Sequence, residues 1–285
     1  MMCRALALGA CDRVLGLGST QIADGPGPDA PPSCPAIGTP PRFSAVIHQQ
    51  AMDPCNSYSI SDATGLATGE CDPTGPAIVG SDGTLVPITL NHPLSTAIES
   101  IELSPRSNDI WAYQVDTTGT VAVYAQQDAA TWAQVETPFS FPDNSAQISP
   151  PAFTATGRRV LVVAATSSGL FEAYEDSGTW EQRQILLPSG VTPLTSAGIY
   201  LSPDGLRMIF PAQVVIDDPD PTLQYGLVYA DRADASALFG APVLLSGVPR
   251  LDDGSPDLAY PFMTEDCGHL YVRALDQILY FNLSY

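Results

Sequence analysis

Short apolar runs separated by turn-forming residues recur along this chain. The clearest example is residues 201–210, which read LSPDGLRMIF. Pro203 and the pair Asp204-Gly205 favour a tight turn, and the apolar residues after them predict the start of a strand. The pattern predicts a β-hairpin, and its recurrence predicts a repeat protein.

Four further copies of this hairpin align on a small hydroxyl residue that precedes the turn. By subtraction, neighbouring copies are about 43, 50, 48 and 62 residues apart, which is the range of propeller blades. We call these hydroxyl residues the anchors: Ser61, Ser104, Thr154, Ser202 and Thr264.

A second hairpin follows three of the anchors, and an aromatic residue opens its last strand. These aromatics are Trp132, Trp180 and Phe239. Two hairpins make a four-stranded antiparallel sheet, which is one propeller blade. We expect the aromatics to pack between blades, and the alternative is stacking against a ligand.

The fold class that these repeats predict is all-β, a β-propeller with five blades; six blades are the alternative. The last blade is short, because only residues 278–283 can form a strand after Val272. A propeller closes when an N-terminal strand completes the last blade, and residues 43–48 are the expected strand.

The stretch Ser202-Pro203-Asp204-Gly205 and the apolar strand after it resemble the repeat of TolB-like β-propellers, relatives of the WD-repeat class. Residues 232–242 and 261–272 resemble the terminal half of such repeats in exported bacterial proteins. The resemblance covers roughly residue 44 to the C-terminus. It implies the fold and not the function, because propellers serve as enzymes, scaffolds and receptors.

The first eleven residues hold one arginine, a short apolar stretch and then Leu8-Gly9-Ala10-Cys11. This resembles the lipobox of bacterial lipoproteins, which implies that Cys11 is lipidated and becomes the mature N-terminus; the alternative is an ordinary disordered N-terminus. The expected organisation is a signal segment over 1–11, a flexible Pro/Gly/Asp-rich spacer over 12–35 and a propeller over 36–285.

The charge of the chain restricts its partners. The formal net charge is -20, and all eleven basic residues are arginines. Such a surface repels nucleic acid and anionic lipid headgroups. We therefore expect no nucleic-acid partner. The resemblance to a lipobox implies an exported protein of the cell envelope that contacts the membrane only through an N-terminal lipid, and we expect a monomer.

Four cysteines remain once Cys3 is assigned to the signal and Cys11 to the lipid. Cys55 and Cys71 are equally far from the centre of the first hairpin, so they face each other across an antiparallel pair, within reach of a disulfide. Cys34 and Cys267 are then left to pair by elimination.

No nucleophile elbow, zinc-protease motif, phosphate loop or dinucleotide fingerprint is present, so no catalytic residue is predicted. Of the carboxylates, only Glu99, Glu102, Glu265 and Asp266 lie on or near inner strands. Two acidic clusters are weak candidates for Ca²⁺, and the favoured alternative is a solvated loop with no cofactor. The clusters are Asp217, Asp218 and Asp220, and Asp252, Asp253 and Asp257.

Two functions fit this organisation. The first is a binding or scaffold module in a bacterial envelope, whose partner is an envelope protein or a small ligand. The second is a propeller hydrolase that acts on a glycan or lactone through carboxylates or a metal at the channel mouth. Three or more acidic or His side chains at one mouth would favour the enzyme, and a channel lined by Ser, Thr and apolar residues would favour the module.

Overall fold

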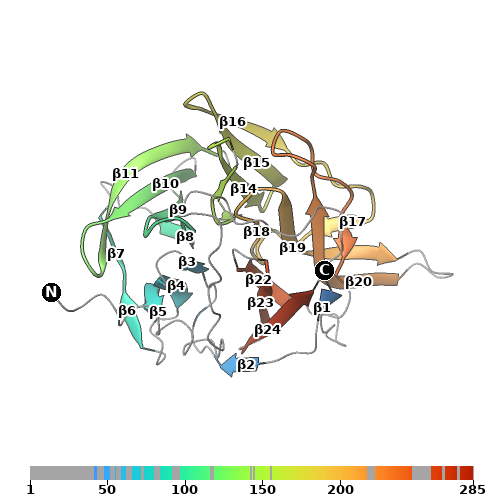
Figure 1. The fold of residues 1–285 in the computed structure, drawn as a ribbon, viewed down its shortest axis with the longest axis horizontal. Helices are drawn as coiled ribbons and strands as arrows, with labels where there is room; N and C mark the ends of the chain where they lie inside the picture. The colour runs from blue at the N-terminus through green and yellow to red at the C-terminus, as the bar shows by residue number, and fades with distance from the viewer. Residues whose placement is uncertain are drawn as a thin grey trace, which may run out of the picture.

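The computed structural model shows a ring of five β-sheets around a central axis (Figure 1). The structure describes residues 42–43, 48–51, 55, 59–61, 66–71, 74–79, 84–91, 97–115, 119–141, 143, 145–154, 156–216, 222–245, 258–264, 267–274 and 277–284. These residues form β-strands without any α-helix, so none of them makes a helix that could span a membrane. The five-bladed, all-β propeller is confirmed.

The first two blades are antiparallel meanders. Blade 1 consists of β3 (Ser59–Ser61), β4 (Leu66–Cys71), β5 (Gly75–Val79) and β6 (Leu85–Pro87). Blade 2 consists of β8 (Ala97–Leu103), β9 (Ile110–Val115), β10 (Thr120–Gln126) and β11 (Thr131–Ser140). A strand that the repeat pattern did not predict, β7 (Thr89–Asn91), pairs in parallel with the outer strand of blade 2.

In blades 3 and 4 the innermost strand is broken in two. Blade 3 consists of β12 (Ala146–Ile148) and β13 (Ala152–Phe153), then β14 (Arg159–Ala165), β15 (Gly169–Asp176) and β16 (Thr179–Gln184). Blade 4 consists of β17 (Val191–Pro193) and β18 (Tyr200–Leu201), then β19 (Arg207–Ile216), β20 (Thr222–Asp231) and β21 (Val243–Leu244).

Blade 5 combines the two ends of the chain. It consists of β22 (Leu258–Met263), β23 (His269–Ala274) and β24 (Gln277–Ser284), and two N-terminal strands complete it, β1 (Arg42–Phe43) and β2 (His48–Ala51). Both N-terminal strands pair antiparallel with β24. The expected closure by an N-terminal strand is therefore confirmed, and the predicted signal and spacer, residues 1–35, lie outside the described residues.

The anchors owe their place in the repeat to backbone hydrogen bonds. The hydroxyl oxygen of Ser202 accepts hydrogen bonds from the backbone N–H groups of Leu206 (3.2 Å) and Arg207 (2.9 Å). Its own N–H donates to the carbonyl of Arg207 at 2.8 Å. In the same way, Ser104, Thr154 and Thr264 accept N–H groups of their own turns. A small hydroxyl residue therefore closes each of these turns.

The hydrophobic core lies between blades rather than inside them. Trp132 is fully buried in the cluster that blade 2 shares with blade 1, and its indole N–H donates to the carbonyl of Asn108 at 2.7 Å. Trp180 packs against the cluster between blades 2 and 3, and Phe239 against that between blades 3 and 4. The expectation that these aromatics pack between blades is confirmed.

Candidate site at the centre of the ring

The innermost strands of neighbouring blades are hydrogen-bonded to one another. The backbone N–H of Leu103 donates to the hydroxyl of Ser59 at 3.1 Å, which joins blades 2 and 1. The other three junctions are Ile148 N–H to Ser100 Oγ (3.3 Å), Phe153 N–H to Pro203 O (2.8 Å) and Tyr260 N–H to Ala197 O (2.6 Å). The wall around the axis is therefore braced directly from blade 1 to blade 5.

Two carboxylates lie on this wall, both on β8 of blade 2. They are Glu99 and Glu102, and the described inner strands of the other blades hold no acidic residue or histidine. In the part of the chain that the structure describes, no three His, Cys, Asp or Glu side chains form a group that could hold a metal. Glu265 and Asp266 lie outside the described residues, as do the Ca²⁺ candidates Asp217, Asp218, Asp220, Asp252, Asp253 and Asp257.

Glu102 has a raised pKa, whereas the resolved shifts of the other described carboxyl groups are downward. It is half-buried, and burial raises its pKa well above the ordinary value, an effect that a hydrogen bond with the Ser59 hydroxyl partly offsets. The same hydroxyl accepts the N–H of Leu103. A carboxyl group that keeps its proton to higher pH can donate it as a general acid.

Glu99 belongs to a second polar group, between blades 2 and 3. The hydroxyl of Ser145 donates to its carboxylate at 3.3 Å. Nearby, the buried carboxylate of Asp143 accepts the backbone N–H of Ser145 and both the N–H and the hydroxyl of Ser167. Burial acts to raise the pKa of Asp143, but these hydrogen bonds outweigh it and lower the pKa overall. Asp143 therefore links the segment around Ser145 to the turn at Ser167, and its carboxylate oxygens stabilise the fold.

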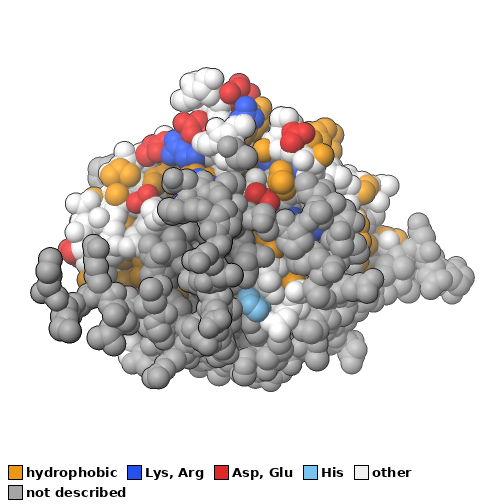
Figure 2. Space-filling model, viewed as in Figure 1, with side chains coloured by type: hydrophobic (Ala, Val, Ile, Leu, Met, Phe, Trp, Pro, Cys, Tyr) orange, Lys and Arg blue, Asp and Glu red, His pale blue; other side chains and the backbone are white. Residues whose placement is uncertain are grey.

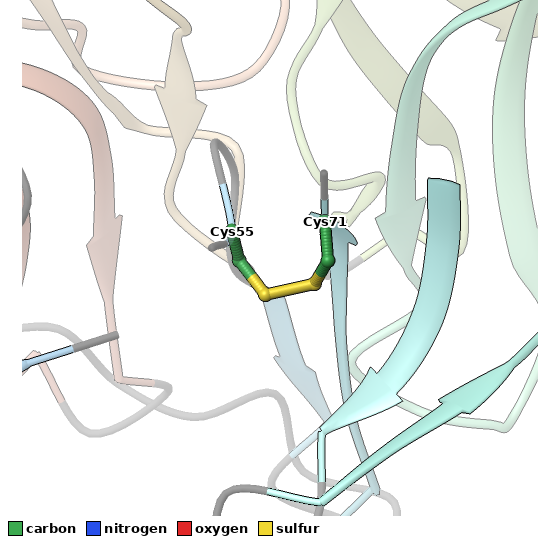
Figure 3. The surroundings of a disulfide bond; sticks show 2 residues. All are labelled: Cys55 and Cys71. Carbon is green, nitrogen blue, oxygen red and sulfur yellow. A yellow bond between two sulfur atoms is a disulfide. The ribbon is translucent and has the colours of Figure 1, made fainter. Parts of the chain in front are cut away.

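The disulfide expected between Cys55 and Cys71 is present, and the two residues form an isolated antiparallel bridge (Figure 3). Cys267 is buried and disulfide-bonded as well. Cys11 and Cys34 lie outside the described residues, so lipidation of Cys11 and the pairing of Cys34 with Cys267 stay predictions.

Arginines form a second set of contacts between blades, which the sequence pattern did not reveal. Arg159 on β14 binds Glu136 of blade 2 at 2.7 Å and Glu175 of its own blade at 2.7 Å. Its guanidinium also lies over the rings of Trp111 and Trp180, 5.7 Å and 5.3 Å from their centroids. Figure 2 shows acidic and basic side chains side by side over blade 3. The sequence offered one signal for these contacts: all of its basic residues are arginines, the residue that bidentate and stacked contacts require.

The sequence matches no protein-family model and no curated protein. Solved structures similar to this chain include a gluconolactonase from Xanthomonas campestris, at 10% identity and a TM-score of 0.47 over 89% of this chain and 98% of that one. A putative 6-phosphogluconolactonase from Bacteroides uniformis has 15% identity and a TM-score of 0.40, over 73% and 60% of the two chains. The β-propeller domain of Cps50 (Swd1) from Myceliophteria thermophila has 12% identity and a TM-score of 0.43, over 81% and 84%.

Proposed function

We propose that this protein is an exported, lipid-anchored propeller that serves as a binding or scaffold module of the bacterial cell envelope. The observation that carries the proposal is the bracing of the inner strands from blade to blade through Ser59, Ser100, Pro203 and Ala197. Serine hydroxyls and backbone groups make these junctions. The polar groups of these junctions therefore serve rigidity, and a rigid ring suits the presentation of a surface to a partner.

The buried charges support the same proposal. Arg183 and Arg232 both bind Glu172 between blades 3 and 4, and Arg207 binds Asp231 at 2.6 Å within blade 4. Arginines committed in this way cannot offset the carboxylates at the surface, so the surface is strongly acidic. A strong acidic field favours cationic partners and suppresses anionic ones.

Export and lipidation are tested first. The full chain is produced in a Gram-negative host fed an alkyne-bearing fatty acid, as wild type, as Cys11→Ala and as the matched control Cys3→Ala. We expect label and membrane fractionation in the wild type and the control, and neither in Cys11→Ala. Label that persists in Cys11→Ala would overturn the anchor.

A propeller hydrolase is the second candidate, and Glu102 is the observation that favours it. Its raised pKa fits a general acid. Glu99 is on the same strand but bonds Ser145 between blades 2 and 3, so Glu102 alone carries this candidate. The purified protein is assayed on lactones and aryl glycosides, with and without added Ca²⁺. The module predicts no turnover above that of Glu102→Gln. Turnover that this variant abolishes would establish the hydrolase instead.

Calcium is tested on its own. If the acidic clusters outside the described residues bind it, Ca²⁺ raises the melting temperature of the purified protein and Mg²⁺ at the same ionic strength does not. Equal melting curves with both ions would leave these clusters as solvated loops.

A further inference from the structure

Cys267 occupies the position in its turn, the third after the anchor, where blades 3 and 4 have glycine; blades 1 and 2 have Thr64 and Ser107 there. Its backbone N–H donates to the carbonyl of the anchor Thr264 at 2.8 Å. Gly157 and Gly205 make the same bond to their own anchors, at 2.9 Å and 2.7 Å. The φ angles are 56° for Cys267, 79° for Gly157 and 75° for Gly205, all in the left-handed region.

A cysteine at this position is disfavoured by its own side chain. Left-handed backbone is comfortable for glycine and strained for residues with a Cβ atom. The next residue is Gly268, so blade 5 keeps a glycine one place too late for the turn. The turn accepts this strain and gains a cysteine, whose side chain is fully buried and disulfide-bonded.

The partner of Cys267 must come from the N-terminal segment. Cys55 and Cys71 bind each other, and the remaining cysteines are Cys3, Cys11 and Cys34. All three precede β1, which starts at Arg42.

Strand β1 ends close to the Cys267 turn. The N–H of Leu283 donates to the carbonyl of Gly268 at 2.7 Å, and Leu283 pairs with Phe43 of β1. Phe43 is therefore about two strand spacings, or roughly 10 Å, from Gly268. Eight residues separate Cys34 from Arg42 by subtraction, and that length spans at most about 26–29 Å. The reach is sufficient.

We propose that Cys34 is the partner, and that the disulfide straps the N-terminal spacer to one face of the propeller. This choice rests on the proposed function, because a lipidated Cys11 has no free thiol. The face is the one that carries the turns after the anchors. We call it the anchor-turn face. Its turns contact one another: Arg106 donates to the carbonyl of Phe153 at 3.2 Å, and Ser61 to that of Ser107 at 3.4 Å.

The strap determines which surface a partner meets. A spacer fixed at Cys267 leaves the molecule from the anchor-turn face, so the membrane lies on that side and the opposite face is turned to the partner. Thr156 lies on the anchor-turn face and Ser168 on the opposite face, so a probe at each position reports on one face. Both are exposed, and they lie beyond opposite ends of β14, which is about 20 Å long.

Disulfide mapping tests the strap. Because the chain has no lysine, trypsin cleaves only after arginine and places Cys11, Cys34 and Cys267 in separate peptides: residues 5–13, 14–42 and 251–273. Digestion of the full chain without reductant should give 14–42 linked to 251–273, a species that disappears on reduction. A link between 5–13 and 251–273 would overturn both the strap and the lipidation of Cys11. Unlinked 251–273 would overturn the strap alone.

Orientation is tested on the lipidated full chain in vesicles whose headgroups carry a quencher. A fluorescent amino acid replaces Thr156 in one sample and Ser168 in the other. We expect stronger quenching at residue 156, and loss of that difference when Cys34→Ser or Cys267→Gly opens the strap. Cys267→Gly introduces the residue that the turns of blades 3 and 4 have at this position, and glycine relieves the strain of a positive φ, so the variant should fold. Equal quenching at both positions in the wild type would overturn the orientation.

Discussion

The carboxylate of Glu172 and the guanidinium of Arg232 form an ion pair across the boundary between blades 3 and 4, closed to solvent on both sides. Arg183 binds the second carboxylate oxygen at 2.5 Å and also donates to the carbonyls of Ser236 and Ala237. Burial lowers the pKa of Arg232, and Glu172 opposes that effect. The carboxylate therefore compensates for the Arg232 guanidinium, which the blade boundary has taken out of water, and also binds Arg183, whose side chain is partly exposed.

Glu172→Gln should destabilise the ring by about 3–5 kcal/mol, because it leaves Arg232 buried without its counter-charge. Urea denaturation followed by circular dichroism measures the loss. The matched control is Asp176→Asn, which breaks an exposed pair with Arg158 (3.3 Å) and should cost at most about 1 kcal/mol. Similar losses in the two variants would mean that Glu172 does not hold the boundary.

Gly198 and Tyr260 show how closely blades 4 and 5 approach. A Cβ atom on Gly198 would lie 2.7 Å from Cδ1 and 2.8 Å from Cα of Tyr260, and the φ angle of Gly198 is 78°. Gly198→Ala should cost about 1–2 kcal/mol of backbone strain and a further 1–3 kcal/mol of overpacking. Gly178, with φ 82° and no atom within 4 Å of the added Cβ, is the control, and Gly178→Ala should cost only the strain. Thermal melts compare the two.

The repeat pattern was sufficient to predict the blades, because each blade needs its own turn chemistry and its own apolar strands. The closing strand was predictable for the same reason: the last blade lacks a strand in the sequence, and β1 and β2 supply it. The parallel strand β7 was not predictable, since three residues that extend an existing edge have no periodicity of their own.

The candidate site was harder to predict than the fold. Sequence spacing placed Glu102 on an inner strand, but its pKa depends on burial, which raises it, and on a hydrogen bond with Ser59 of another blade, which partly offsets the rise. The bonds of Arg159 and Arg232 join residues 23 and 60 positions apart in the chain. Such pairs depend on how blades stack, and a single sequence contains no signal for it.

Ser202→Ala tests the role of the anchors. The variant removes the hydroxyl that accepts the N–H groups of Leu206 and Arg207. The N–H of Leu206 keeps the Asp204 carboxylate as an acceptor at 3.0 Å, whereas the buried N–H of Arg207 is left unsatisfied, which costs about 1–3 kcal/mol. Thr154→Val is the near-isosteric companion in blade 3, where the N–H of Arg158 loses its acceptor. That bond is only partly buried, so the variant should cost less. The free energies of unfolding of both variants show whether the anchor hydroxyls stabilise their turns. If neither variant loses stability, the hydroxyl is not what the repeat selects.

The raised pKa of Glu102 predicts the direction in which stability changes with pH. Its pKa in the folded state lies above its ordinary value of 4.5, so the folded protein holds a proton that the unfolded chain has released. The resulting stabilisation is complete below the unfolded pKa and is lost as the pH rises through the folded pKa, at no more than about 1.4 kcal/mol per pH unit. Asp143 and Glu175 have lowered pKa values and act in the opposite direction, because their contribution to stability is lost as the pH falls.

Asp143 and Glu175 are present in both wild type and Glu102→Gln, so the difference in unfolding free energy between these two proteins isolates the contribution of Glu102. That difference should move in favour of Glu102→Gln as the pH rises above about 4.5. A difference that stays constant with pH would mean that Glu102 ionises in the folded ring as readily as in water, and it would remove the general acid on which the hydrolase reading depends.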